Sequence, residues 1–206
     1  LFLWVFPGNY NIFDSRIASL KPFFELAPML YLLLIPAITM RMISDEKRMG
    51  TLELLLTRPL GRFQLILSKY LAALSLVFIS LVPTLIYFIT IWLLGSPAGN
   101  IDSGATWGSF AGLLFLASAY IAIGLFASAL TSSQVVAFLI AVAASFSFYI
   151  GFEFVATTQI PLAIQNILLK LGINNHYQSI SRGVVDSRDL AYFIALTILF
   201  LWITKG

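Results

Sequence analysis

Long uncharged runs of apolar residues recur along this chain of 206 residues and limit what it can fold into. A bilayer core contains no water to satisfy backbone N–H and C=O groups, so a run that crosses it must be helical. About 20 apolar residues suffice for one crossing. The predicted spans are residues 23–42, 70–94, 107–130, 135–154 and 190–203, with a shorter run at residues 1–6. The sequence therefore predicts an all-α, polytopic membrane protein with one transmembrane domain over residues 1–206.

The composition excludes most other classes of protein. Hydrophobic residues make up 60% of the chain and charged residues 10%, with a mean hydropathy of +0.95. Soluble domains are about 45–50% apolar and about a quarter charged. We therefore exclude a soluble enzyme, a nucleic-acid-binding protein and a disordered tail. The chain has no cysteine, which excludes disulfides, thiolate catalysis and cysteine-based zinc sites.

Both ends of the chain resemble interrupted spans. Residues 1–6 have neither the basic start nor the small-residue cleavage site of a signal peptide. We interpret them as the last turns of a first span. The run at residues 190–203 extends roughly 21 Å as a helix, which is short of the ~30 Å hydrocarbon core. We therefore expect a six-span bundle whose first span is truncated, taken from a parent protein that continues at both ends.

Basic residues concentrate in and beside the segment between the second and third spans, residues 43–69. They are Arg41, Lys47, Arg48, Arg58, Arg62 and Lys69. The loop at residues 95–106 has none, and the segment at residues 155–189 has fewer for its length. Since lysine and arginine favour cytoplasmic loops, we predict that residues 43–69 are cytoplasmic and residues 155–189 lie outside. Lys205 then falls on the cytoplasmic side, which agrees with an even number of spans.

The cytoplasmic segment begins with a pattern typical of a short helix. Ser44 is suited to cap a helix start, and Asp45 and Glu46 follow it, where negative charge is favourable against the helix dipole. Gly50 and Thr51 then interrupt the pattern, and Thr51 is suited to cap a second helix. The segment is therefore predicted to contain two short helices with a break at Gly50-Thr51.

The second of these predicted helices is amphipathic. Leu52, Leu55 and Leu56 fall on one face, and Glu53 points away from it. Pro59 ends the helix, because the residue before a proline disfavours helical backbone. Such a helix between two spans has three uses: it lies on the membrane surface, it packs against loops of its own chain, or it docks a soluble partner that moves. The residue pattern alone does not choose among them.

The fourth span contains a GxxxG spacing at Gly108 and Gly112. Small residues four apart lie on one helix face and let two backbones approach closely. The spacing predicts a tight seam between helices or between subunits. The general abundance of glycine in membrane helices explains it equally well.

The outer segment contains a further amphipathic pattern at residues 160–171. Isoleucine and leucine recur there on one face, and Gly172 is suited to end the helix. The pattern is too short to span a bilayer. We predict a helix that lies in the outer interface or packs on the spans. Its role is either that of a lid over an exit path or that of a plain surface helix, and the sequence does not choose between them.

The isolated polar residues predict no catalytic or metal site and no cofactor. His176 is the only histidine, and a metal site needs several converging ligands. Glu25 and Glu153 are the carboxylates nearest the spans, and both lie near span ends, where the interface solvates them. An ion-coupled secondary transporter, the alternative function, needs ionisable groups at mid-membrane. An intramembrane enzyme needs clustered reactive groups, and the predicted spans show no such cluster.

Two sets of segments carry a resemblance to known families. The region between the second and third spans of ABC-2 type transporter permeases is similar to residues 43–59, ISDEKRMGTLELLLTRP, followed by residues 64–70. The pattern of that family is roughly E-K-x-x-G-T-L-E-x-L-L-x-x-P, then an apolar stretch and a lysine. The gliding-motility-associated permeases of the superfamily are similar at residues 7–12, 94–100, 104–109 and 176–189. The resemblance extends over essentially the whole chain.

The resemblance implies a permease subunit with a type V exporter-like bundle in the bacterial inner membrane. Such subunits dimerise, with an identical or a different permease, and bind two cytoplasmic ABC ATPases. Hydrolysis then falls on the partner, in line with the absence of a G-x-x-x-x-G-K-[ST] loop from this sequence. In such permeases a cytoplasmic helix, here residues 51–57, sits in a groove of the ATPase. The implied coupling residues are Glu46, Gly50, Thr51, Leu52, Glu53, Leu55 and Leu56.

Overall fold

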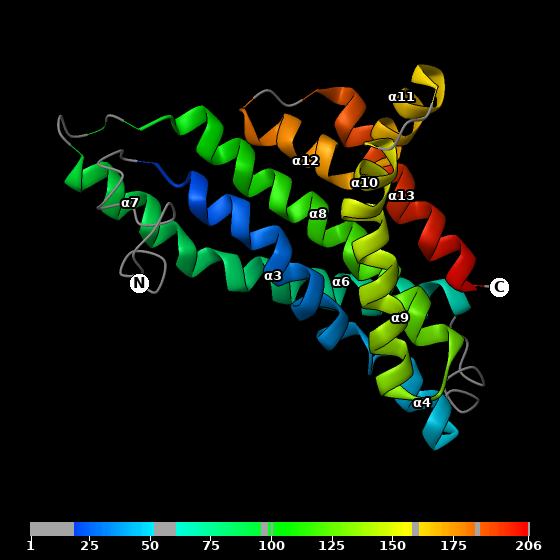
Figure 1. The fold of residues 1–206 in the computed structure, drawn as a ribbon. Helices are drawn as coiled ribbons and strands as arrows, with labels where there is room; N and C mark the ends of the chain where they lie inside the picture. The colour runs from blue at the N-terminus through cyan, green and yellow to red at the C-terminus, as the bar shows by residue number, and fades with distance from the viewer. Residues whose placement is uncertain are drawn as a thin grey trace.

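The computed structural model describes residues 19–51, 61–95, 99, 101–157, 161–183 and 186–205, with the side chains of residues 163 and 164 excepted. Every regular element within these ranges is a helix (Figure 1). Five helical stretches are long and apolar enough to cross a membrane. The predicted all-α, polytopic fold is therefore confirmed. The predicted remnant at residues 1–6 lies outside the described residues.

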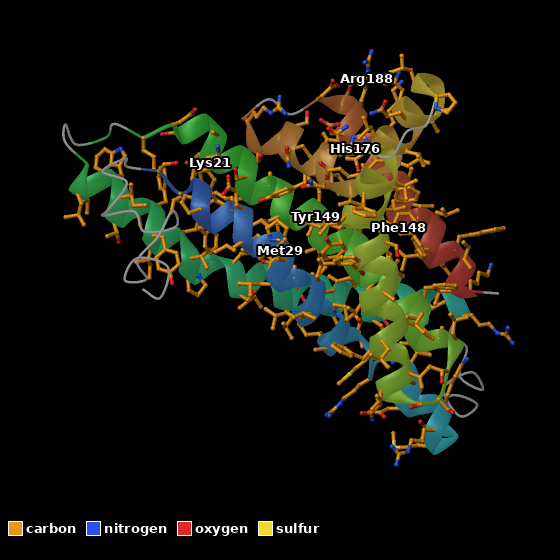
Figure 2. All side chains as sticks on the ribbon, viewed as in Figure 1. Lys21, Met29, Phe148, Tyr149, His176 and Arg188 are labelled. Carbon is orange, nitrogen blue, oxygen red and sulfur yellow. The ribbon has the colours of Figure 1, made fainter. Side chains whose placement is uncertain are left out.

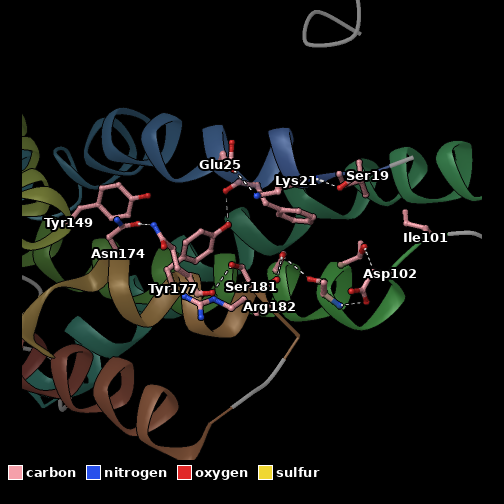
Figure 3. A pocket seen from close by; sticks show the side chains of 16 residues that line it. Ser19, Lys21, Glu25, Ile101, Asp102, Tyr149, Asn174, Tyr177, Ser181 and Arg182 are labelled. Carbon is pink, nitrogen blue, oxygen red and sulfur yellow. Dashed lines mark hydrogen bonds and ion pairs between the residues drawn. The ribbon is translucent and has the colours of Figure 1, made fainter. Parts of the chain in front are cut away.

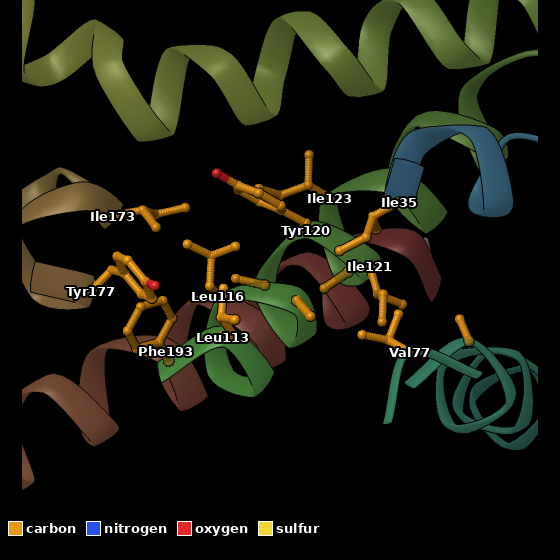
Figure 4. Close-up of a cluster of buried hydrophobic side chains, with 14 of the residues drawn as sticks. Ile35, Val77, Leu113, Leu116, Tyr120, Ile121, Ile123, Ile173, Tyr177 and Phe193 are labelled. Carbon is orange, nitrogen blue, oxygen red and sulfur yellow. The ribbon is translucent and has the colours of Figure 1, made fainter. Parts of the chain in front are cut away.

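Helix α8, Ser103–Leu130, is the axis of the bundle. Its 28 residues extend about 42 Å, and helices α3, α6, α9, α12 and α13 all pack against it. In its most apolar stretch 67% of the residues are buried, compared with 17% to 39% in the other four spans. Glycine, alanine and serine recur along α8, which lets neighbouring backbones approach closely. Figure 4 shows Leu113, Leu116 and Tyr120 of this helix in the core, beside Ile35 and Phe193 from other spans.

Helix α3, Lys21–Thr39, leads through a short turn into helix α4, Ser44–Met49. Helix α4 ends at Gly50, whose φ of 69° is a left-handed conformation that favours glycine. The predicted cap at Ser44 is wrong. Ser44 is already the first helical residue, and its hydroxyl donates to the backbone carbonyl of Met40 instead of accepting from α4.

The next span consists of helix α6, Arg62–Leu81, a 3₁₀ turn at Val82–Thr84 and helix α7, Leu85–Leu94. The turn contains Pro83, which has no N–H for a regular helical bond. Helix α6 begins at Arg62, although hydropathy predicts a start at Tyr70. The side-chain carbonyl of Gln64 accepts from the N–H of Gly61 at 3.1 Å, which stabilises this earlier start.

The fourth described span is helix α9, Gln134–Phe146, followed by a π-helical turn, Ser147–Gly151, and helix α10, Phe152–Ala156. A turn at residues 131–133 joins it to α8. The π turn carries Tyr149, whose ring packs edge-on against the buried Tyr120 at a centroid distance of 6.4 Å.

Two short helices, α11 at Leu162–Leu171 and α12 at Ile173–Ser181, precede the last span, α13 at Ser187–Lys205. The predicted helix at residues 160–171 corresponds to α11, but its apolar side chains Ile167 and Leu171 are exposed. Helix α12 instead packs on the bundle. It buries three apolar side chains, those of Ile173, Tyr177 and Ile180.

The outward faces of the spans are strongly apolar. Leu30, Ile79 and Ile198 are between 57% and 67% exposed, and Figure 2 shows Met29 among the side chains on the spans. A water-soluble surface does not carry apolar patches of this extent. These faces are therefore covered by lipid or by another chain.

Candidate functional site

The bundle has two ends of different character. We call the end with α4, the α8–α9 turn, the start of α6 and the last turn of α13 the α4 end. The opposite end, with α10, α11 and α12, is the α12 end (Figure 1). His176 and Arg188 lie at the α12 end (Figure 2).

At the α4 end, one serine hydroxyl from α8 joins α3 to α4. The Oγ of Ser128 accepts from the backbone N–H groups of Ile43 at 3.1 Å and Ser44 at 3.0 Å. The same hydroxyl donates to the carbonyl of Met40 at 3.0 Å. The first N–H groups of a helix have no partner within it, so Ser128 supplies the cap of α4 from another span. Ser44 and Ser128 are 0% exposed and Ile43 is 4% exposed.

One turn earlier on α8, Gly124 lies directly against Thr39 at the end of α3. A Cβ atom added to Gly124 would lie 2.1 Å from the Oγ1 and 2.9 Å from the Cβ of Thr39. Only glycine fits at this position without a shift of one helix. The hydroxyl of Thr39 donates to the carbonyl of Ile35 at 3.0 Å, which fixes its rotamer. The end of α3 is thus seated on α8 at the point where α4 begins.

Side chains of α4 and its neighbours extend the attachment to two further spans. Lys69 of α6 forms an ion pair with Glu46 at 2.5 Å and also donates to the carbonyl of Met42. This pair is about one-fifth exposed on each side, so water screens it only in part. Gln134, the first residue of α9, donates to the carboxylate of Asp45.

Lys47 of α4 donates to the backbone carbonyl of Ala129, near the end of α8. Helix α4 therefore contacts α6, α8 and α9 through polar side chains, and it follows α3 directly. Helix α4 is thus attached to four spans. Over the described part of the chain, no group of three or more histidine, cysteine, aspartate or glutamate residues is placed to hold a metal ion.

The predicted coupling residues fall partly within this region. Glu46 pairs with Lys69, Gly50 ends α4, and the hydroxyl of Thr51 lies 3.4 Å from the carbonyl of Glu46. The others, Leu52, Glu53, Leu55 and Leu56, lie outside the described residues. The sequence analysis missed the role of Ser128, because nothing in the sequence joins residues 84 positions apart.

The GxxxG face of α8 lies against α12 of the same chain. A Cβ on Gly108 would lie 2.6 Å from the carbonyl oxygen of Ile180, and a Cβ on Gly112 would lie 3.3 Å from the ring of Tyr177. A third glycine, Gly183, has a φ of 86° and approaches the backbone of Ala105. The close contact is therefore one between a span and the short helix α12.

The α12 end holds a cavity of about 620 Å³ between α3, α8 and α12 (Figure 3). Charged side chains of both signs line it: Lys21, Glu25, Asp102 and Arg182. The hydroxyl of Tyr177 donates to the carbonyl of Phe24 at 2.8 Å. Burial raises the pKa of this phenol above its ordinary value, so Tyr177 stays protonated and keeps α12 on α3.

His176 attaches the short helices α11 and α12 to α13. Its Nδ1 lies 2.7 Å from the carboxylate of Asp189, and its Nε2 lies 2.8 Å from the carbonyl oxygen of Lys170. The ring stacks on Tyr192 at a centroid distance of 4.0 Å. Both ring nitrogens face acceptors, so the doubly protonated ring satisfies both contacts and a neutral ring satisfies one.

The two carboxylates that the sequence analysis placed near span ends lie at the α12 end. Glu25 pairs with Lys21 at 3.8 Å on an exposed surface. Glu153 accepts from the side-chain amide of Asn174 at 2.7 Å. Asp189, which the sequence analysis did not single out, is the most buried of these carboxylates, at 7% exposure.

Comparison with known proteins gives one finding. The sequence matches the family profile described as ABC-2 family transporter protein over residues 10–204. The matched range contains nearly all of the described residues, including both ends of the bundle. No curated protein matches the chain.

Proposed function

Because the chain belongs to the ABC-2 family of transporter proteins, we propose that it is a permease subunit driven by a partner ABC ATPase. In this proposal the ATPase binds the segment that follows α4. ATP binding and hydrolysis on the partner then move α4, and the spans change between inward-facing and outward-facing arrangements.

The distribution of charge supports an orientation with the α4 end in the cytoplasm. The basic residues described there are Arg41, Lys47, Arg48, Arg62, Lys69 and Lys205, and the acidic ones are Asp45 and Glu46. At the α12 end the basic residues are Lys21, Lys170, Arg182 and Arg188, and the acidic ones are Glu25, Asp102, Glu153, Asp186 and Asp189. An excess of lysine and arginine favours the cytoplasmic side. The inner membrane of a bacterium is the corresponding location.

The observation that carries the proposal is the cap that Ser128 provides to α4. Movement of α4 can move the spans only if α4 is firmly attached to them. A hydroxyl of α8 holds the start of α4. Helix α8 in turn contacts α3, α6, α9 and α13, and also α12. A push on the segment after Gly50 is therefore delivered to α8, the helix on which the bundle is built.

Two finer parts of the proposal rest on resemblance. Permeases of this kind act in pairs, so we assign a second permease chain, identical or different, as a partner. The similarity of residues 7–12, 94–100, 104–109 and 176–189 to gliding-motility permeases supports a role in surface motility.

The proposal is tested by co-purification with a co-expressed ABC ATPase from the same organism. The full-length protein should retain the ATPase, and Leu55→Asp should abolish retention while the variant still inserts into the membrane. Leu162→Asp is the matched control, since Leu162 is a 77% exposed leucine at the opposite end, and it should retain the ATPase. Retention by Leu55→Asp contradicts the proposal. If the transport rate does not depend on ATP and falls to zero when the ion gradient is dissipated, the ion-coupled alternative is favoured.

A further inference from the structure

Besides the cavity at the α12 end, the bundle has a cavity at the α4 end, in which basic side chains interrupt an apolar lining. It measures about 330 Å³ and lies where α4, α6, α8 and α13 meet. Lys47, Arg62 and Lys205 line it, and Phe126, Leu130 and Ile203 contribute apolar walls. We call it the basic cavity.

No acidic side chain among the described residues balances the charge of the basic cavity from within. The described residues that line it include no aspartate or glutamate. The two described carboxylates on α4 are directed to other partners, Glu46 to Lys69 and Asp45 to Gln134. Three cations around one opening therefore attract an anion.

An apolar groove lies along the same three spans, next to the basic cavity. A cavity of about 670 Å³ lies between α6, α8 and α13 nearer their middles, where its walls include Leu74, Leu114 and Ile198. On α6 the basic cavity is lined from within residues 62–66 and the groove from within residues 70–78. On α8 the corresponding ranges are 126–130 and 111–118, and on α13 they are 203–205 and 194–198. The two cavities are thus lined by consecutive stretches of the same three spans.

This combination of a cationic pocket at a span end and an apolar groove below it matches one chemical class. A phospholipid has a phosphate at the depth where spans end and acyl chains parallel to the spans. We propose that an anionic phospholipid binds here, with its phosphate between Lys47, Arg62 and Lys205 and its chains in the groove. The bound lipid joins α4 to α6 and α13 through Lys47, so its presence stiffens the base of α4.

The test measures lipid binding to the full-length protein without any ATPase, so its outcome is independent of the proposed function. Phosphatidylglycerol or phosphatidylcholine is titrated into the detergent-solubilised protein, and bound lipid is counted by native mass spectrometry. We expect preferential binding of phosphatidylglycerol. Removing a cation near a membrane surface costs roughly fivefold in affinity, so Arg62→Gln combined with Lys205→Gln should lose roughly 25-fold.

The matched control is Arg41→Gln combined with Arg48→Gln. These are two exposed cations at the same end that do not line the cavity, and phosphatidylglycerol binding should stay within about twofold of the unaltered protein. Lys205→Gln alone, in the last turn of α13, gives the same test with the smallest change to the fold. Equal binding of the two lipids, equal losses in the two double variants, or full competition by inorganic phosphate would each overturn the proposal.

Discussion

Replacement of Ser128 by alanine tests the mechanical role of the α4 end most directly. The change removes one hydroxyl that accepts from the N–H groups of Ile43 and Ser44 and donates to the carbonyl of Met40, at 3.0 to 3.1 Å. Ile43 and Ser44 are 4% and 0% exposed, so water does not replace the lost acceptor.

The magnitude follows from the two buried N–H groups left without a partner. Each unsatisfied buried group costs about 1–3 kcal/mol, and loss of a helix cap costs about 0.5–2 kcal/mol. These two estimates describe the same bonds, so we expect Ser128→Ala to destabilise the start of α4 by about 3 kcal/mol. Since 1.4 kcal/mol is tenfold, the local opening equilibrium should rise on the order of a hundredfold.

Hydrogen exchange of the protein in lipid nanodiscs measures this opening. The amides of Ile43 and Ser44 should lose protection in Ser128→Ala, while the thermal unfolding of the whole bundle changes less. Ser118→Ala is the control on the same helix, because the Ser118 hydroxyl lies 3.3 Å from that of Thr197 and caps no helix. Equal exchange at residues 43 and 44 in both variants would show that the Ser128 cap does not stabilise the start of α4.

Two further substitutions test other contacts, each by thermal unfolding in detergent. Gly124→Ala places a Cβ atom 2.1 Å from the Oγ1 of Thr39, and overpacking of this kind costs about 1–3 kcal/mol. Gly104→Ala, whose Cβ would meet nothing closer than 3.5 Å, should be neutral or stabilising, and equal effects would refute the reasoning. His176→Leu leaves the buried carboxylate of Asp189 without its ring partner and should cost about 2 kcal/mol. His176→Gln should recover part of the loss through one donor, and no loss in the leucine variant would contradict the assigned contact.

The spans were predictable because hydropathy is a local property. Five apolar runs became five long helices, and their ends differ from the predicted ones where charge is involved. Helix α6 starts at Arg62 instead of Tyr70, and Lys69 lies within the helix, where it pairs with Glu46. A hydropathy profile treats Lys69 as the end of the apolar run, because the profile carries no information about the Glu46 side chain that pairs with it.

The sequence of helix α12 contains a periodic pattern that predicts its buried face. Its buried side chains Ile173, Tyr177 and Ile180 are spaced i, i+4 and i+7, as on one helix face. The polar residues between them masked the pattern. His176 and Asp189 lie on different helices, thirteen positions apart, so no periodicity predicted their contact.

The α4 end was the least predictable part of the site. The identities of Glu46 and Gly50 stood out from the sequence, but the contacts that fix α4 to α8 and α9 join residues more than eighty positions apart. Ser128 is one of many serines in membrane helices, where a hydroxyl commonly bonds to its own helix. Only the fold reveals that this hydroxyl serves a different helix.

The crowding around α8 restricts how this protein can diverge. A helix at the rim of a bundle has one side that meets lipid, and substitutions accumulate on that side at little cost. Helix α8 has packed neighbours around most of its surface, so a larger residue displaces a neighbour at most positions where it is introduced. Relatives that share this architecture should therefore differ least along α8, and new transport specificities should arise from changes in the helices that surround it.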